Sequence, residues 1–277
     1  MPHLPMPATF TRGNRRMAYR DYGDGPRVLV LTHGLLMDSR MYTELAPALA
    51  AQGHRVITVD MLGHGASDHP HDMTAHSMSQ YGEDIIALLD HLKIPQAVIG
   101  GTSLGANVSL EAAVLAPQRV RALVLEMPVL ENGISAAAAM FVPLALALRT
   151  TQPVMRAVAA LTRRIPRSHW LADLLIDFVR RDPASSLAVL DGLTFGRIAP
   201  PGSARRQLQH PTLVIGHPSD PIHPFSDADT TARELVGARL MQASSIYEWR
   251  VRPSRLTSAL TEFLDEAWAT PHAVAAS

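Results

Sequence analysis

The 277-residue chain contains no cysteine, and this absence excludes several kinds of site at once. Without cysteine the chain has no disulfide, no cysteine nucleophile and no thiolate metal ligand. A net charge is also absent, because 25 basic side chains balance 25 acidic ones. No charge excess favours nucleic acid or an anionic membrane as a partner. We therefore expect a small-molecule partner, and the sequence leaves the oligomeric state open.

The chain also lacks a recognisable export signal and a long apolar run. Its first residues, "MPHLPMPATFTRGNRRM", have no apolar stretch between a basic start and a small-residue cleavage site, which predicts a cytoplasmic protein. The most apolar run, "SAAAAMFVPLALAL", is shorter than the roughly 20 residues that a membrane span needs, and it contains Pro143. We expect a buried or cap helix there and no membrane span.

What the sequence does contain is an alternation of short apolar runs and helical patterns. The runs are of the kind found in parallel sheets that are covered on both faces, and between them apolar residues recur at helical spacing before a Gly or Pro. This alternation predicts βαβ units and an α/β fold with a mostly parallel central sheet. The predicted strands are 27–33, 55–60, 97–102, 121–126 and 212–217, and a last helix is predicted from about Pro253.

The alternation stops between Met127 and about Pro211. These residues contain no convincing strand but several apolar helical segments separated by prolines. We therefore predict an all-helical cap at 128–210, inserted between an N-terminal part of the α/β core at 1–127 and a C-terminal part at 211–277.

The strongest local motif is Gly101-Thr102-Ser103-Leu104-Gly105, which fits G-x-S-x-G between a predicted strand and a predicted helix. In a nucleophile elbow the serine lies at a sharp turn, and the glycines let neighbouring backbone pass close to it. The following helix points backbone N–H groups toward a developing oxyanion. Ser103 is therefore the candidate nucleophile, although a glycine-rich turn capped by serine would look the same.

Two further loops follow predicted strands. In "VLVLTHGLL" the strand ends at His33-Gly34, which makes the backbone N–H groups of Leu35 and Leu104 the candidate oxyanion donors. We interpret His33 as a structural histidine that binds loop backbone. In "VDMLGHGASD" we expect Asp60 to accept backbone N–H bonds and organise the turn. The histidines nearby lack a metal-ligand pattern, so we expect neither a metal nor another cofactor.

Together, the segments "HGLL", "DMLGHGASD", "GGTSLGA" and "VIGHPSDPIHP" make the chain resemble the α/β-hydrolase fold family, in the family's order and spacing. The resemblance implies an α/β-hydrolase core with a helical cap and an acid in the loop after a late strand, which matches Asp220. An Asx-turn before Pro221 is the alternative interpretation of Asp220. The resemblance also implies a catalytic histidine before the last helix, but Ser245-Ile246 stand there instead, and no histidine occurs between His223 and His272.

His223 is the first candidate to replace the missing base, because it lies in the same loop as Asp220. A surface or pocket-lining histidine is the competing interpretation. His217, His33 and His272 are weaker candidates, and Glu126 is an alternative acid that we expect to be a solvated strand end.

We therefore predict a serine hydrolase with an atypical triad of Ser103, Asp220 and His223. Because the cap is apolar, we expect an ester or similar acyl substrate with hydrophobic parts. Two alternatives stay open: a non-hydrolytic lyase, cyclase or isomerase of specialised metabolism on the same fold, and a pseudoenzyme that only binds a ligand.

Overall fold

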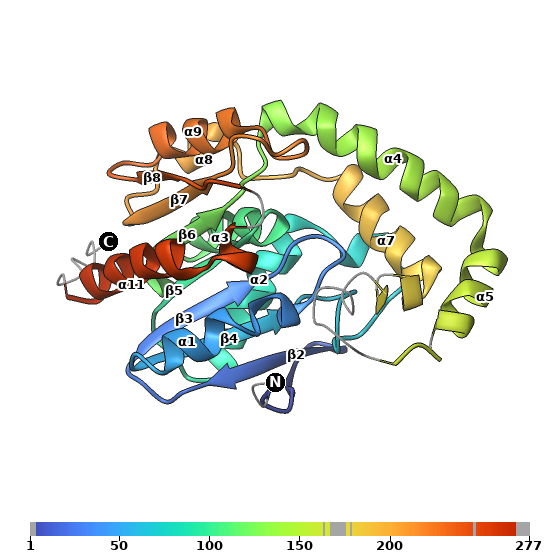
Figure 1. Ribbon diagram of the computed structural model, residues 1–277, viewed down its shortest axis with the longest axis horizontal. Coiled ribbons are helices and arrows are strands. Elements are labelled where there is room, and N and C mark those ends of the chain that lie inside the picture. Colours follow the sequence, from blue (N-terminus) through green and yellow to red (C-terminus); the bar gives the residue numbers. More distant parts are fainter. Residues whose placement is uncertain (1–3, 163, 167–175, 178, 246–247, 270–277) are drawn as a thin grey trace.

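The computed structural model describes residues 4–162, 164–166, 176–177, 179–245 and 248–269, which form one eight-stranded sheet with helices on both faces (Figure 1). The strand pairs β1–β2 and β2–β4 are antiparallel, and every other neighbouring pair is parallel. This arrangement confirms the predicted α/β class. In spatial order the strands are β1 (Ala8–Arg12), β2 (Arg15–Tyr22), β4 (His54–Asp60), β3 (Arg27–Thr32), β5 (Ala97–Thr102), β6 (Val120–Glu126), β7 (Thr212–Gly216) and β8 (Arg239–Gln242).

The five strands predicted from apolar runs all form, each within one residue of the expected bounds. Every residue of β5, β6 and β7 is buried, as expected for parallel strands covered on both faces. The sequence patterns do not predict β1, β2 or β8. The two outermost strands, β1 and β8, are largely exposed and therefore carry no continuous apolar run.

Helices cover the two faces of the sheet with separate cores. The core on one face includes residues of α2 (Met78–His91), α3 (Leu104–Leu115) and α9 (Phe225–Glu234). The other face packs against α1 (Leu45–Ala50) and α11 (Ser254–Ala269), and the apolar face predicted for the last helix is buried there. The shorter helices are η1 (Ser39–Tyr42), η2 (Met73–Ala75), η3 (Pro117–Arg119), η4 (Glu131–Gly133), α8 (Gly202–Arg205) and α10 (Glu248–Val251).

The segment between β6 and β7 contains α4 (Ile134–Thr150), α5 (Gln152–Thr162) and α7 (Pro183–Thr194), and its described residues form no strand. Figure 1 shows α4 and α5 along the margin of the molecule, with α7 between them and the rest of the chain. The apolar run judged too short from sequence belongs to a helical stretch of 20 residues, Glu131–Thr150. Among the described residues this is the one helix long and apolar enough to cross a membrane by length and composition. Pro143 does not end it.

Candidate active site

Ser103 lies at a sharp turn between β5 and α3. Its backbone adopts φ 55° and ψ −111°, a left-handed conformation that is strained for a residue with a Cβ. The Ser103 N–H donates to the Glu126 carbonyl oxygen at 2.8 Å, which holds the turn against the end of β6. Because α3 begins at Leu104, the N–H groups of its first turn have no carbonyl partner within the helix.

The glycines of the motif are required by close backbone contacts. A Cβ built on Gly101 or on Gly105 would overlap the carbonyl oxygen of Thr32, at the end of β3. The Thr32 hydroxyl in turn donates toward the Gly100 and Gly105 carbonyl oxygens, each at 3.1 Å. The turn that carries Ser103 therefore depends on small residues on both sides of the serine.

His223 and Asp220 lie in the loop after β7, and the structure brings both to Ser103. The His223 Nε2 atom is 2.8 Å from Ser103 Oγ, and His223 Nδ1 is 2.8 Å from Asp220 Oδ2. The His223 and Asp220 side chains are 15% and 5% exposed, so the chain of contacts is largely shielded from water. Three polar groups thus line up in the order carboxylate, imidazole and hydroxyl.

The second oxygen of Asp220 organises its own loop. Asp220 Oδ1 accepts the N–H groups of Ile222 and His223 at 2.8 and 3.0 Å. The Asx-turn and the contact with the imidazole therefore occur together, on different oxygens of one carboxylate. Burial raises the pKa of Asp220, but the hydrogen bonds from His223 and from the two N–H groups outweigh it, so the pKa lies below its ordinary value.

This charge state sets the proton positions. An ionised Asp220 only accepts, so the His223 Nδ1–H donates to the carboxylate. In the neutral form of the ring, Nε2 then carries the lone pair and accepts from the Ser103 hydroxyl. That is the tautomer a base needs if it is to take the serine proton.

Leu35 and Leu104 line the same cavity as Ser103 and His223, so the structure brings the two candidate oxyanion donors to the candidate nucleophile. The cavity holds about 160 Å³. Among the described residues that line it, none is Asp, Glu, Lys or Arg, and the polar side chains are those of Ser103, Asn107, Thr194 and His223. The space beside Ser103 is thus apolar and free of formal charge apart from any on His223.

Two buried histidines support the loop that carries Leu35. The Met61 N–H donates to His33 Nε2 at 3.1 Å, and the Leu36 N–H donates to His64 Nε2 at 3.2 Å. Both rings therefore carry their proton on Nδ1, which donates to the Gly34 and Leu62 carbonyl oxygens. Burial lowers the pKa of both histidines, His64 well below its ordinary value. The structural interpretation of His33 is confirmed.

Asp60 also has the predicted role. Its two carboxylate oxygens accept the N–H groups of Ser39 and Ala66 at 2.7 and 2.9 Å. The side chain thereby joins the loop after β3 to the loop after β4.

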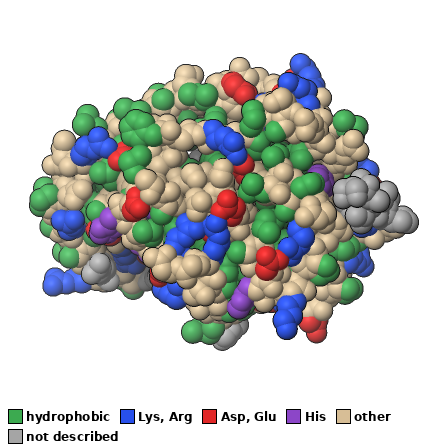
Figure 2. Space-filling model, turned by 180° about the vertical axis from the view of Figure 1, so that it is seen from behind, with side chains coloured by type: hydrophobic (Ala, Val, Ile, Leu, Met, Phe, Trp, Pro, Cys, Tyr) green, Lys and Arg blue, Asp and Glu red, His purple; other side chains and the backbone are tan. Residues whose placement is uncertain are grey.

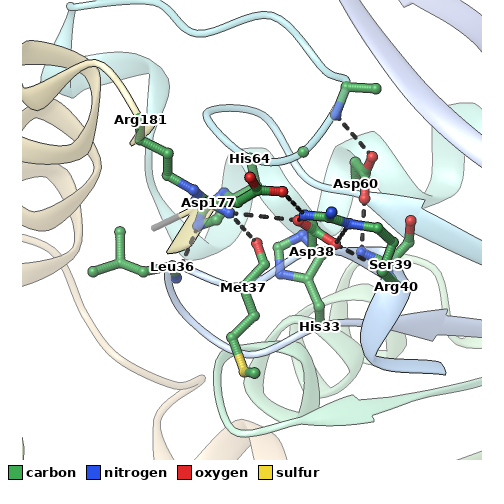
Figure 3. Close-up of polar contacts among 12 residues, drawn as sticks. His33, Leu36, Met37, Asp38, Ser39, Arg40, Asp60, His64, Asp177 and Arg181 are labelled. Atoms are coloured by element: carbon green, nitrogen blue, oxygen red, sulfur yellow. Dashed lines mark hydrogen bonds and ion pairs between the residues drawn. The ribbon is translucent and has the colours of Figure 1, made fainter. Parts of the chain in front are cut away.

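Charged side chains connect the loop after β3 to the helical segment, as Figure 3 shows. Arg181 donates from Nη2 to the Met37 carbonyl oxygen at 2.7 Å. Arg40 pairs with both Asp38 and Asp177. Burial raises the pKa of Asp38, but hydrogen bonds from Arg40 outweigh it and keep the pKa below its ordinary value. Side chains of the α/β core and side chains of the helical segment therefore both hold the loop that carries Leu35.

Glu126 is not the solvated strand end expected from sequence. It is 1% exposed, accepts a hydrogen bond from the Thr102 hydroxyl, and has Oε1 3.4 Å from His217 Nε2. His217, also buried, contacts the Ser245 carbonyl oxygen through Nδ1 at 2.8 Å. His217 therefore packs against Glu126 and the Ser245 backbone. Ser245 and Ile246 stand where the resemblance implies a histidine. Ile246 lies outside the described residues.

Asn107 and Asp227 hold the site together but are not predicted from sequence. Asn107 Nδ2 donates to the carbonyl oxygens of Val129 and Ile198, at the two ends of the helical segment. Asp227 accepts the N–H groups of Leu130 and Gly133 at 2.7 and 2.8 Å. No sequence signal could have found them, because their partners, which are mostly backbone groups, are distant in sequence. In the described part of the chain, no group of three His, Asp or Glu side chains is placed to hold a metal ion.

Comparisons with known proteins agree with this geometry at the level of the fold. A dihydrolipoyllysine-residue acetyltransferase component of an acetoin cleaving system from Pseudomonas putida is 40% identical over 122 residues, which cover 44% of this chain and 32% of that protein. The chain thus spans about a third of that relative. A 2-hydroxymuconate semialdehyde hydrolase from Pseudomonas sp. strain CF600 is 30% identical over 89% of this chain and 86% of its own length.

A solved structure has the same fold. The crystal structure of a hydrolase from Pseudomonas aeruginosa superposes with a TM-score of 0.76 at 23% identity, covering 93% of this chain and 98% of that one. The family model described as alpha/beta hydrolase fold matches residues 27–224, a span that runs from the first parallel strand through the loop of Asp220 and His223. The chain therefore belongs to the alpha/beta hydrolase fold family.

Proposed function

We propose that this protein is a serine hydrolase that cleaves uncharged esters with an apolar acyl part, with Ser103 as nucleophile, His223 as base and Asp220 as its acid partner. The observation that carries the proposal is the pair of 2.8 Å contacts from the His223 ring, one to Ser103 Oγ and one to Asp220 Oδ2. A serine hydroxyl is a weak nucleophile without such a base.

In the proposed reaction Ser103 Oγ attacks the ester carbonyl carbon, and its proton moves to His223 Nε2. The N–H groups of Leu35 and Leu104 stabilise the oxyanion, and Asp220 stabilises the imidazolium. His223 then gives the proton to the departing alkoxide, which leaves as an alcohol. Water attacks the acyl-enzyme by the same route, with His223 as its base, and releases the acid and the free Ser103 hydroxyl.

The lining of the cavity supports the choice of an uncharged substrate. The substrate in the name of the Pseudomonas relative, a 2-hydroxymuconate semialdehyde, carries a carboxylate. A carboxylate buried without a cationic partner is costly. The described cavity lining offers no Lys or Arg, and apolar side chains such as Leu104, Phe141 and Leu190 make up most of it. We therefore infer that this chain acts on a different class of substrate from that relative.

The test compares p-nitrophenyl butyrate with the p-nitrophenyl monoester of succinate, which is similar in length but carries a carboxylate. Wild type should favour the butyrate by about 100-fold in kcat/KM, since a buried unpaired charge costs several kcal/mol. Ser103→Ala should lower turnover of the butyrate by about 1,000-fold or more and abolish labelling by a fluorophosphonate.

His91→Ala, which changes an exposed histidine, is the matched control and should retain activity. Equal rates for wild type and Ser103→Ala would overturn the proposed mechanism. A preference for the succinate ester would overturn the substrate class while leaving the mechanism intact.

A further inference from the structure

The outer side of α4 and α5 is unusually apolar for a surface. Of the fourteen large hydrophobic side chains that are exposed among the described residues, eight lie between residues 134 and 165. In Figure 2 hydrophobic side chains gather on the upper left, the side that corresponds to α4 and α5 in Figure 1. Contiguous apolar patches of this kind mark interaction sites. The eight are Ile134, Met140, Val142, Leu146, Val154, Val158, Leu161 and Ile165; we call them the cap face.

The cap face follows helical periodicity. In α4 the exposed residues Ile134, Ala138, Val142 and Leu146 recur every four positions, and in α5 Val154, Val158 and Leu161 recur at four and three. Each set therefore forms a stripe along one side of its helix. Leu146 and Leu161 are 61% and 65% exposed, so these side chains have no apolar partner within the described chain that covers them.

Another side of α4 is already packed. Phe141, Leu144 and Leu148 belong to a small core with Leu36 and Leu190, which ties α4 to α7 and to the loop after β3. A helix held on one side in this way is placed to lie along an interface rather than to cross a bilayer, although its length and composition would suffice for crossing.

The charges on this segment have one sign. Residues 134–165 contain four arginines, Arg149, Arg156, Arg163 and Arg164, and no Asp, Glu or Lys. The Arg149 and Arg156 side chains are 57% and 55% exposed, and they also pair with Asp191 and Asp182 outside the segment. Basic side chains beside exposed apolar ones favour binding to anionic lipid surfaces.

The cap face is continuous with the candidate active site. Ile134, Ala138 and Val142 are exposed members of the α4 stripe and also line the cavity that contains Ser103 and His223. A surface that contacted the stripe would therefore lie at the border of the cavity. An apolar substrate dissolved in a lipid layer would reach Ser103 from that border.

We propose that the cap face docks onto the surface of a bilayer that contains anionic phospholipid, with α4 and α5 lying in the plane of the interface. Arg149, Arg156 and Arg164 contact lipid headgroups, and the two apolar stripes enter the boundary between headgroups and acyl chains. Docking concerns where the protein sits and does not depend on catalysis by Ser103. A failure of docking and a failure of the proposed hydrolysis are therefore distinguishable.

The test is co-sedimentation of the full chain with vesicles of phosphatidylcholine and phosphatidylglycerol, compared with phosphatidylcholine alone. We expect wild type to bind the anionic vesicles and to bind the neutral ones about tenfold more weakly. Leu146→Glu with Leu161→Glu should weaken binding to anionic vesicles by about tenfold or more. The matched control, Met6→Glu with Val236→Glu, changes two side chains that are 83% and 66% exposed elsewhere, and it should bind like wild type.

A second measurement does not depend on the folding of a charged variant. Because the chain has no cysteine, Leu146→Cys can be labelled alone with a polarity-sensitive fluorophore, and Val236→Cys serves as its control. The emission of the label at position 146, but not at 236, should shift to shorter wavelength on addition of anionic vesicles. No shift at 146, or equal shifts at both positions, would overturn the proposal. Failure to bind vesicles, combined with a dimer that the double glutamate variant dissociates, would assign the cap face to a second copy of this chain.

Discussion

The loop after β7 and the segment between β8 and α11 differ in what their described residues contribute to the candidate site. In the first, Asp220 and His223 are three residues apart, and His223 contacts both Asp220 and Ser103. In the second, where the resemblance implies a histidine, the Ser245 carbonyl oxygen contacts His217. Nucleophilic chemistry requires an imidazole nitrogen within hydrogen-bond reach of the serine and does not specify the loop that supplies it. A short Asx-turn can therefore present both acid and base.

The largest expected effect comes from the two histidines of the β7 loop. His223→Gln should lower kcat for p-nitrophenyl butyrate by about 1,000-fold or more, because it removes the proposed base. His217→Gln should leave kcat within about tenfold but lower the free energy of unfolding by about 1–3 kcal/mol, since it disturbs a fully buried side chain. Steady-state kinetics of both variants give kcat, and urea denaturation gives the free energy of unfolding. A larger loss of kcat in His217→Gln would reverse the assignment.

A smaller effect is expected from substitution of Gly105, one of the glycines on which the turn at Ser103 depends. Gly105→Ala should lower the free energy of unfolding by about 2–4 kcal/mol. The Cβ of the new alanine would overlap the Thr32 carbonyl oxygen, which a Cβ at Gly101 would also overlap. Gly202→Ala is the control: its Cβ would meet only the ends of flexible side chains. Thermal unfolding of both variants gives the comparison. Equal melting temperatures would show that the strand and the turn can move apart without cost.

The smallest effect concerns pH. The pKa values of Asp38 and Asp220 lie below their ordinary value of 3.8, so both carboxylates stabilise the fold fully above that pH and lose the contribution as pH falls through their lower folded values. Urea denaturation at pH 7, 5 and 3 should therefore show little change from these groups between pH 7 and 5 and a lower stability at pH 3. In Asp38→Asn the fall should be smaller, and an unchanged fall would place the acid sensitivity elsewhere.

Much of the fold was readable from sequence because its signals are local. A buried parallel strand needs an apolar run, and the turn at Ser103 needs glycine on both sides, so β5 and the elbow were located to within a residue. The edge strands β1 and β8 and the buried state of Glu126 were not, because these depend on which neighbours cover a residue. Asn107 and Asp227 gave no signal for the same reason.

By itself the sequence determined the α/β class, the candidate nucleophile at Ser103 and the lack of a histidine before α11. It also made His223 a candidate base, because this histidine lies in the same loop as Asp220. Only the tertiary structure decided between His223 as a surface residue and His223 in contact with Ser103. These two residues are 120 positions apart, and their 2.8 Å contact arises because β5 and β7 flank β6 and end at the same edge of the sheet.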